Sequence, residues 1–133
     1  MMIRILISIL CLAAAAPALA HSQSYGYLTV TPSGDTLTGS LDLAVRDLDT
    51  LYDLDGDRDG QITWAELRAR EAELQAAVLS KISIGVEAGV CGLKPNPVMI
   101  DSRGGETYAV FPFSGSCPAY GSKLMISYDL MFN

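Results

Sequence analysis

The sequence predicts an α+β protein: a small antiparallel or mixed β-domain with one helix–loop–helix inserted between its second and third strands. Several short segments alternate apolar and polar residues, which is the period of a strand with one buried face. A single stretch, about residues 46–80, changes to helical spacing. With 133 residues, the chain is long enough for one domain with a real core and too short for two.

The first 20 residues have the pattern of a secretory signal peptide. Arg4 supplies a positive charge, residues 5–16 form an apolar run, and residues 18–20 have the small residues of a cleavage site. The run is shorter than the roughly 20 residues that a membrane-spanning helix needs. We therefore expect an exported protein, periplasmic or secreted, whose single mature domain covers residues 21–133.

The mature chain is predicted to begin with a hairpin. Residues 25–30 favour a strand, residues 31–35 have the composition of a turn, and residues 36–45 alternate with a period of two. The expected inner face of the second strand consists of Leu37, Gly39, Leu41, Leu43 and Val45. Helical spacing over the same leucines keeps a helix open as an alternative, but Gly39 and the threonines favour the strand.

Two helices are predicted to flank the loop that follows. The first covers residues 46–54, and the second begins after Thr63, which can cap it together with Glu66 three residues later. The second helix is expected to end near Ser80. Its apolar stripe, more typical of core packing than of a partner-binding groove, consists of Trp64, Leu67, Leu74 and Val78.

The rest of the chain favours strands. The predicted segments are an alternating strand at Ile82, Ile84 and Val86, a loop at 94–97, a hairpin of 98–101 with 107–113 turning at 103–105, and a last strand with Leu124, Ile126, Tyr128, Leu130 and Phe132 on one face.

The loop between the helices reads D-G-D-R-D-G-Q-I-T-W-A-E over residues 55–66 and matches the EF-hand calcium loop at every position that the pattern specifies. Calcium takes about six to eight oxygens at roughly 2.3–2.6 Å, and a short curled backbone can supply them. The expected ligands are one carboxylate oxygen each from Asp55, Asp57 and Asp59, the main-chain carbonyl of Gln61, Thr63 directly or through water, and both oxygens of Glu66.

Two neighbours of these ligands have structural roles in the pattern. Gly60 stands where the loop turns sharply, and Ile62 is expected to point away from the metal and fix the loop to a core or to a partner loop. A solvated acidic turn without metal is the alternative. EF-hand loops usually occur in pairs, and the sequence has no second acidic loop, so the strands or a second copy of the chain must support this one.

Cys91 and Cys117 are the two cysteines of the mature domain, because Cys11 lies in the signal peptide. In an oxidising compartment they are expected to form a disulfide. A redox or metal-thiolate role is the alternative, but the C-x-x-C spacing that favours it is absent.

The formal net charge of −6 becomes −7 when Arg4 leaves with the signal peptide. Five of the fifteen acidic residues lie between Asp53 and Glu66, so the acidity is concentrated at the predicted site. No basic cluster indicates nucleic acid, and no set of nucleophile, base and orienting group indicates an enzyme or a small-molecule substrate.

These motifs together resemble the periplasmic N-terminal domain of HupE/UreJ-type bacterial membrane proteins. The likeness is carried by G-S-L-D-L-A-V-R-D-L-D at 39–49, D-L-D-G-D-R-D-G-Q-I-T-W-A-E-L-R at 53–68, the cysteine pair and the closing Y-D-L-M-F. It implies a periplasmic module related to proteins of nickel or related metal transport. Those proteins continue into transmembrane helices that these 133 residues lack, so we expect no transport by this chain itself.

The sequence therefore predicts a calcium-binding module, not an enzyme, that calcium orders and that presents a surface to a partner. A membrane protein and a second copy of the chain are the partners left open. The alternative function is capture of copper or nickel by His21, whose imidazole and free α-amino group would form a chelating pair after cleavage at residue 20.

Overall fold

The computed structural model of this protein describes residues 25–119 and 123–130. The predictions for the signal peptide, for His21 and for Phe132 lie outside these residues. The described part is α+β, as predicted, and every strand pairing in it is antiparallel. Strands dominate, and the helices lie between β2 and β3 in the chain.

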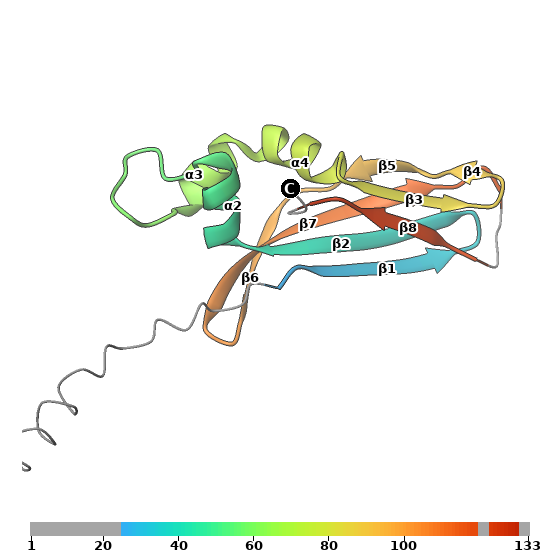
Figure 1. Cartoon of the computed structure of the whole chain (residues 1–133), viewed down its shortest axis with the longest axis horizontal. Helices are drawn as coiled ribbons and strands as arrows, with labels where there is room; N and C mark the ends of the chain where they lie inside the picture. Colours follow the sequence, from blue (N-terminus) through green and yellow to red (C-terminus); the bar gives the residue numbers. More distant parts are fainter. Residues whose placement is uncertain (1–24, 120–122, 131–133) are drawn as a thin grey trace, which may run out of the picture.

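The larger sheet has five strands in the order β1-β2-β7-β5, with β6 also paired to β7 (Figure 1). Its strands are β1 (Tyr27–Ser33), β2 (Thr36–Ala44), β5 (Gly92–Pro95), β6 (Met99–Arg103) and β7 (Glu106–Ser116). Because β5 and β6 pair with opposite ends of the eleven-residue β7, they act as one interrupted edge strand.

The smaller sheet has three strands in the order β4-β3-β8. They are β3 (Ile82–Val86), β4 (Gly89–Val90) and β8 (Met125–Tyr128). This sheet lies beside α4 over one half of the larger sheet, so the protein is elongated, with the α2–α3 loop at one end and β4 near the other (Figure 1).

The helices of the described residues are α2 (Val45–Tyr52), α3 (Trp64–Ala69) and α4 (Glu71–Leu79). The single helix predicted from residue 63 to about residue 80 is wrong, because the chain breaks at Arg70, which has φ −113° and ψ 12°. The stripe is also partly wrong. Leu67, Leu74 and Val78 are buried, but Trp64 at the start of α3 is 46 % exposed, since the first turn of α3 projects past the edge of the core.

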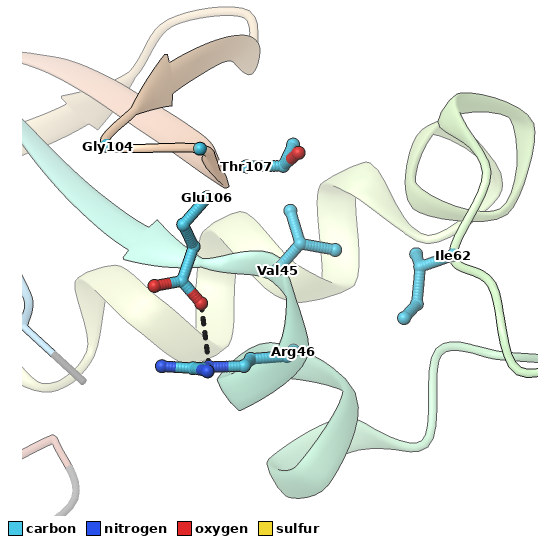
Figure 2. Close-up of a pocket in the computed structure, with 7 residues that line it drawn as sticks. Val45, Arg46, Ile62, Gly104, Glu106 and Thr107 are labelled. Atoms are coloured by element: carbon cyan, nitrogen blue, oxygen red, sulfur yellow. Dashed lines mark ion pairs between the residues drawn. The ribbon is translucent and has the colours of Figure 1, made fainter. Parts of the chain in front are cut away.

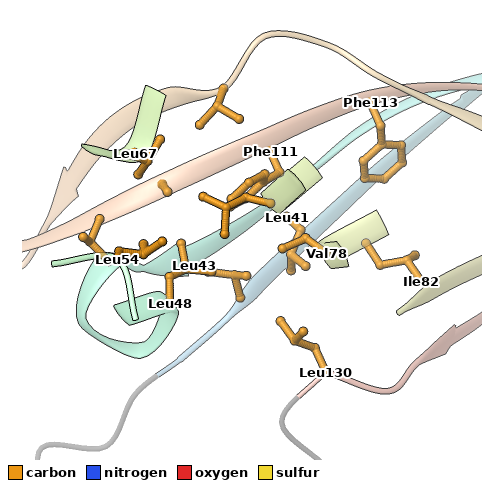
Figure 3. Close-up of a cluster of buried hydrophobic side chains, with 14 of the residues drawn as sticks. Leu41, Leu43, Leu48, Leu54, Leu67, Val78, Ile82, Phe111, Phe113 and Leu130 are labelled. Atoms are coloured by element: carbon orange, nitrogen blue, oxygen red, sulfur yellow. The ribbon is translucent and has the colours of Figure 1, made fainter. Parts of the chain in front are cut away.

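One hydrophobic core joins both sheets to the helices (Figure 3). The inner face of β2 supplies Leu37, Leu41 and Leu43, as predicted, and Phe111 and Phe113 of β7 lie on the same face. Figure 3 shows side chains of the helices and of β3 meeting these residues, among them Leu48, Leu67, Val78 and Ile82. The helix–loop–helix is therefore anchored to the sheets by apolar packing at both flanks.

Three further predictions of the β segments need correction. The turn between β1 and β2 is shorter than expected, because Thr31, Pro32 and Ser33 still pair with β2. Lys94 and Pro95 belong to β5 and are not in a loop. The last strand is shorter than expected, because β8 covers only Met125–Tyr128 and Leu130 lies beyond it.

Asp42 lies on the face of β2 opposite to its buried leucines, yet it is only 2 % exposed. The guanidinium of Arg103 forms an ion pair with its carboxylate and lies 4.7 Å from the ring centre of Tyr27. A contact between residues 61 positions apart has no local sequence signal.

The predicted disulfide joins Cys91 to Cys117. Cys91 lies between β4 and β5 and Cys117 directly follows β7, so the bond ties the smaller sheet to the larger one at the end where β4 lies. Across the described residues, no helix has the length and apolar character needed to cross a membrane.

Candidate metal centre

The candidate loop starts where α2 is stopped by its own acidic side chain. Asp53, after the last residue of α2, has a left-handed conformation with φ 51°. The Oδ1 atom of Asp49 then accepts hydrogen bonds from the N–H groups of Leu54 (2.7 Å) and Asp55 (2.9 Å). Leu54 is buried, so the chain enters the loop from a fixed point in the core.

Inside the loop, the aspartates fold the backbone around themselves. Asp55 accepts hydrogen bonds from the N–H groups of Asp59 (3.1 Å) and Gly60 (2.8 Å), and Asp59 accepts one from Gln61 (2.8 Å). Gly60 has φ +84°, a conformation that a side chain would penalise. This is the sharp turn that the sequence pattern predicts at Gly60.

The result is a cluster of three carboxylates. Asp55, Asp57 and Asp59 each place one oxygen so that the three oxygens lie within 4.8 Å of one another. Asp57 and Asp59 are exposed and Asp55 is half-buried. Three anionic oxygens at this spacing are compatible with a single hard cation held between them.

Glu66 closes the loop from its far end. Its Oε1 accepts a hydrogen bond from Gly56 N–H (2.9 Å), so the last residue of the twelve contacts the second. Its Oε2 accepts from both the N–H and the hydroxyl of Thr63 (2.8 Å each), and Glu66 N–H returns a bond to the Thr63 oxygen. This reciprocal pair is the capping box that the sequence predicts for the start of α3.

These bonds determine what Glu66 must do to bind a metal. A carboxylate has about four lone-pair sites, and two of them on Oε2 are directed at Thr63. Ligation through both oxygens therefore requires the Thr63 hydroxyl to turn away, which would free that hydroxyl for the metal or its water. The structure brings Asp55, Asp57 and Asp59 together, and it keeps Glu66 and Thr63 bonded to each other at the loop's exit.

Two carboxyl groups in the loop have shifted pKa values in opposite directions. The hydrogen bond from Asp59 N–H lowers the pKa of Asp57, but desolvation and the neighbouring carboxylates of Asp59 and Glu66 outweigh it, so the net shift is upward. Hydrogen bonds from the Thr63 N–H and hydroxyl lower the pKa of Glu66. The surroundings therefore favour the protonated form of Asp57 and the ionised form of Glu66.

Arg70 and Asp49 hold the ends of the candidate loop, and neither residue was predicted from the sequence. The guanidinium of Arg70, at the break between α3 and α4, donates hydrogen bonds to the main-chain oxygens of Tyr52 and Asp53 (3.0 Å for Asp53) and pairs with Glu73. It thus joins the end of α2 to the region after α3. Nothing in the sequence signals a contact between Arg70 and residues 17 or 18 positions earlier.

Ile62 connects the loop to the β-domain. It is half-buried and packs against the core, which is the first of the two supports expected for it. An open pocket of about 460 Å³ lies between Ile62 and the tip of the β6–β7 hairpin. Figure 2 shows Ile62 on one side of Val45 and, on the other side, the ion pair of Arg46 with Glu106 (2.7 Å).

Comparison with protein-family models, with curated proteins and with solved structures found no match to this chain. The donor set of the loop consists of oxygen atoms, which suits calcium or magnesium better than the softer transition metals. The alternative copper or nickel site at His21 lies outside the described residues and stays a prediction.

Proposed function

We propose that this protein is an exported calcium-binding module with one EF-hand-type site in residues 55–66. The observation that carries the proposal is the gathering of the Asp55, Asp57 and Asp59 carboxylates within 4.8 Å, in a loop that Glu66 closes. The proposed ligands are these four carboxylates, the Gln61 carbonyl and Thr63, directly or through water.

Calcium fits this donor set better than magnesium does. Calcium accepts six to eight oxygens in flexible geometry, whereas magnesium demands an almost ideal octahedron and keeps several waters. The loop offers carboxylate, carbonyl and hydroxyl oxygens from six residues of one short segment. That arrangement supplies many oxygens with little geometric rigidity.

Calcium binding is proposed to order the loop and stiffen the end of the domain from which the loop projects. Asp55, Asp57, Asp59 and Glu66 repel one another without a cation, so binding and folding of this segment are coupled. Extracellular modules of this kind bind at about 10⁻⁴–10⁻³ M, so the site would be filled wherever calcium is plentiful. A site that stays filled supports a structural role for calcium over a regulatory one.

The proposed consequence is presentation of a surface to a membrane or protein partner. The resemblance to HupE/UreJ-type periplasmic domains supports a membrane protein as that partner. The exposed side chain of Trp64, inside the loop, and the adjacent exposed Ile100 of β6 provide apolar area for such a contact.

Terbium luminescence tests the site directly, because terbium replaces calcium in oxygen sites and is sensitised by a nearby tryptophan. Excitation of Trp64, the only tryptophan, should give terbium emission that calcium displaces. Glu66→Gln should raise the calcium concentration needed for half-displacement at least about tenfold, since it removes a bidentate anionic ligand. The matched control Glu87→Gln, in the exposed turn between β3 and β4, should leave it unchanged; equal affinities for the two variants would refute the site.

A further inference from the structure

The open edge of β8 is the surface from which a further inference follows. In the described part of the chain, β8 pairs with β3 on one side and with no strand on the other. Exposed edges are usually protected by charged residues or proline: β1 contains Pro32, and β6 contains Asp101 and Arg103. The four residues of β8, Met-Ile-Ser-Tyr, contain neither.

The hydrogen-bond pattern shows which main-chain groups this edge presents. The oxygen of Ile84 in β3 accepts a bond from Cys91 N–H (2.8 Å), so the polar groups of Ile84 face β4. Ile84 stands opposite Ile126 in the pairing of β3 with β8. Where two opposite residues of an antiparallel pair do not hydrogen-bond to each other, the main-chain N–H and C=O of both point away from the pair. The hydrogen bond from Asp129 N–H to the Lys81 oxygen (2.9 Å) agrees with this, because the main-chain groups of successive residues in β8 point alternately toward β3 and away from it. The N–H and C=O of Ile126 therefore point to the open edge.

The side chain of Ile126 indicates that this edge is incomplete. Ile84, directly opposite and on the same face, is fully buried, whereas Ile126 is 48 % exposed. Among the described residues the sheet ends at β8, so no further strand covers the inner face beyond Ile126. One more strand on this edge would bury the isoleucine and satisfy its main-chain groups.

The charged residues on either side of β8 indicate which strand would pair with its open edge. Lys123 and Asp129 are exposed, are equally spaced from Ile126, and form no ion pair within the described residues. They cannot meet within one chain, since six extended residues at roughly 3.3 Å each hold them about 20 Å apart. When a second β8 pairs antiparallel with Ile126 opposite Ile126, each Lys123 comes opposite Asp129 of the other copy.

We propose that two copies of the chain pair through β8 about a two-fold axis centred on Ile126, joining their smaller sheets into one six-stranded sheet. Such an interface is self-complementary in hydrogen bonds, in apolar side chains and in charge, as a two-fold contact requires. It lies on β8, away from the α2–α3 loop (Figure 1), and it does not depend on calcium binding.

Sedimentation equilibrium of the protein purified after expression of the full chain, at about 0.15 M salt, tests this pairing. The wild type should show a monomer–dimer equilibrium. Lys123→Asp and Asp129→Lys, each alone, should raise the dimer dissociation constant at least about fivefold, because each places two pairs of like charges face to face. The double reversal should restore the wild-type constant.

Ile126→Pro provides a second, independent variant. It removes an N–H that faces away from β3, so the β3–β8 ladder and the thermal midpoint should survive while the dimer is lost. Glu66→Gln should dimerise like the wild type, which separates this proposal from the metal site. A wild type that stays monomeric up to millimolar concentration, or a dimer insensitive to the single charge reversals, would overturn the pairing and leave the edge to another partner.

Discussion

At the scale of single residues, the packing of β2 against β7 leaves no room at Gly39. An added Cβ there would lie 2.5 Å from the ring of Phe113 and 2.5 Å from the main-chain oxygen of Thr29. Gly39→Ala should therefore destabilise the fold by about 1–3 kcal/mol, the usual cost of overpacking a core. Urea unfolding measures this difference.

Gly92→Ala is the matched control, since Gly92 is also a strand glycine but its added Cβ meets no atom within 4 Å. It should unfold at the wild-type urea concentration. If both variants unfold at that same concentration, the close contact between Gly39 and Phe113 is not present in solution.

The sequence patterns predicted contacts between residues that are close in the chain and missed contacts between residues that are far apart in it. The turn at Gly104 and Gly105, with φ of 59° and 82°, follows from two glycines between alternating segments. The capping box at Thr63 and Glu66 follows in the same way from spacing. The burial of Asp42 does not, because it depends on Arg103 and Tyr27, which are distant in sequence.

At the scale of the helix–loop–helix, Arg70 should control how well the loop is pre-organised. Its hydrogen bonds to the Tyr52 and Asp53 oxygens hold the end of α2 against the segment after α3. Arg70→Met keeps much of the aliphatic length and removes these bonds. We expect calcium affinity to fall by about three- to tenfold, because the loop must then be ordered at binding; calorimetry measures this.

Arg68→Met is the matched control for Arg70. Arg68 pairs with Glu71 and lies 5.4 Å from the ring centre of Trp64, but no hydrogen bond or ion pair joins it to α2 among the described residues. Its loss should leave calcium affinity unchanged. Equal weakening by both variants would mean that general surface charge, and not the contact with α2, sets the affinity.

Strands and helices could be predicted where the spacing of their apolar residues differs. Alternation identified β2, β3 and the β6–β7 hairpin, and helical spacing located the helices. The break at Arg70 was missed because Leu67, Leu74 and Val78 keep helical spacing across it. The pairing of Lys94 and Pro95 with β7 was missed because strand formation there depends on the distant partner and not on local composition.

At the scale of the whole molecule, the disulfide and the candidate site occupy opposite ends. Cys91 lies between β4 and β5, and Cys117 directly follows β7. The α2–α3 loop projects from the other end (Figure 1). Replacing both cysteines by serine should lower the free energy of unfolding by about 3–4 kcal/mol in the chain-entropy description. Chemical denaturation with and without a reductant measures this loss.

The same double variant should bind calcium with wild-type affinity wherever it remains folded, because the described residues place the disulfide beside β4, at the end opposite to the loop. Calorimetry below the unfolding transition tests this independence. Loss of binding in the folded variant would show that the two ends are coupled.

Calorimetric titration of residues 21–133 with calcium, in a magnesium background and beside Glu66→Gln, tests the central claim most directly. The claim predicts one saturable site per chain, with a dissociation constant of about 10⁻⁴–10⁻³ M or tighter, that is lost or weakened at least about tenfold in the variant. No binding up to several millimolar calcium, or equal binding by Glu66→Gln, would contradict it.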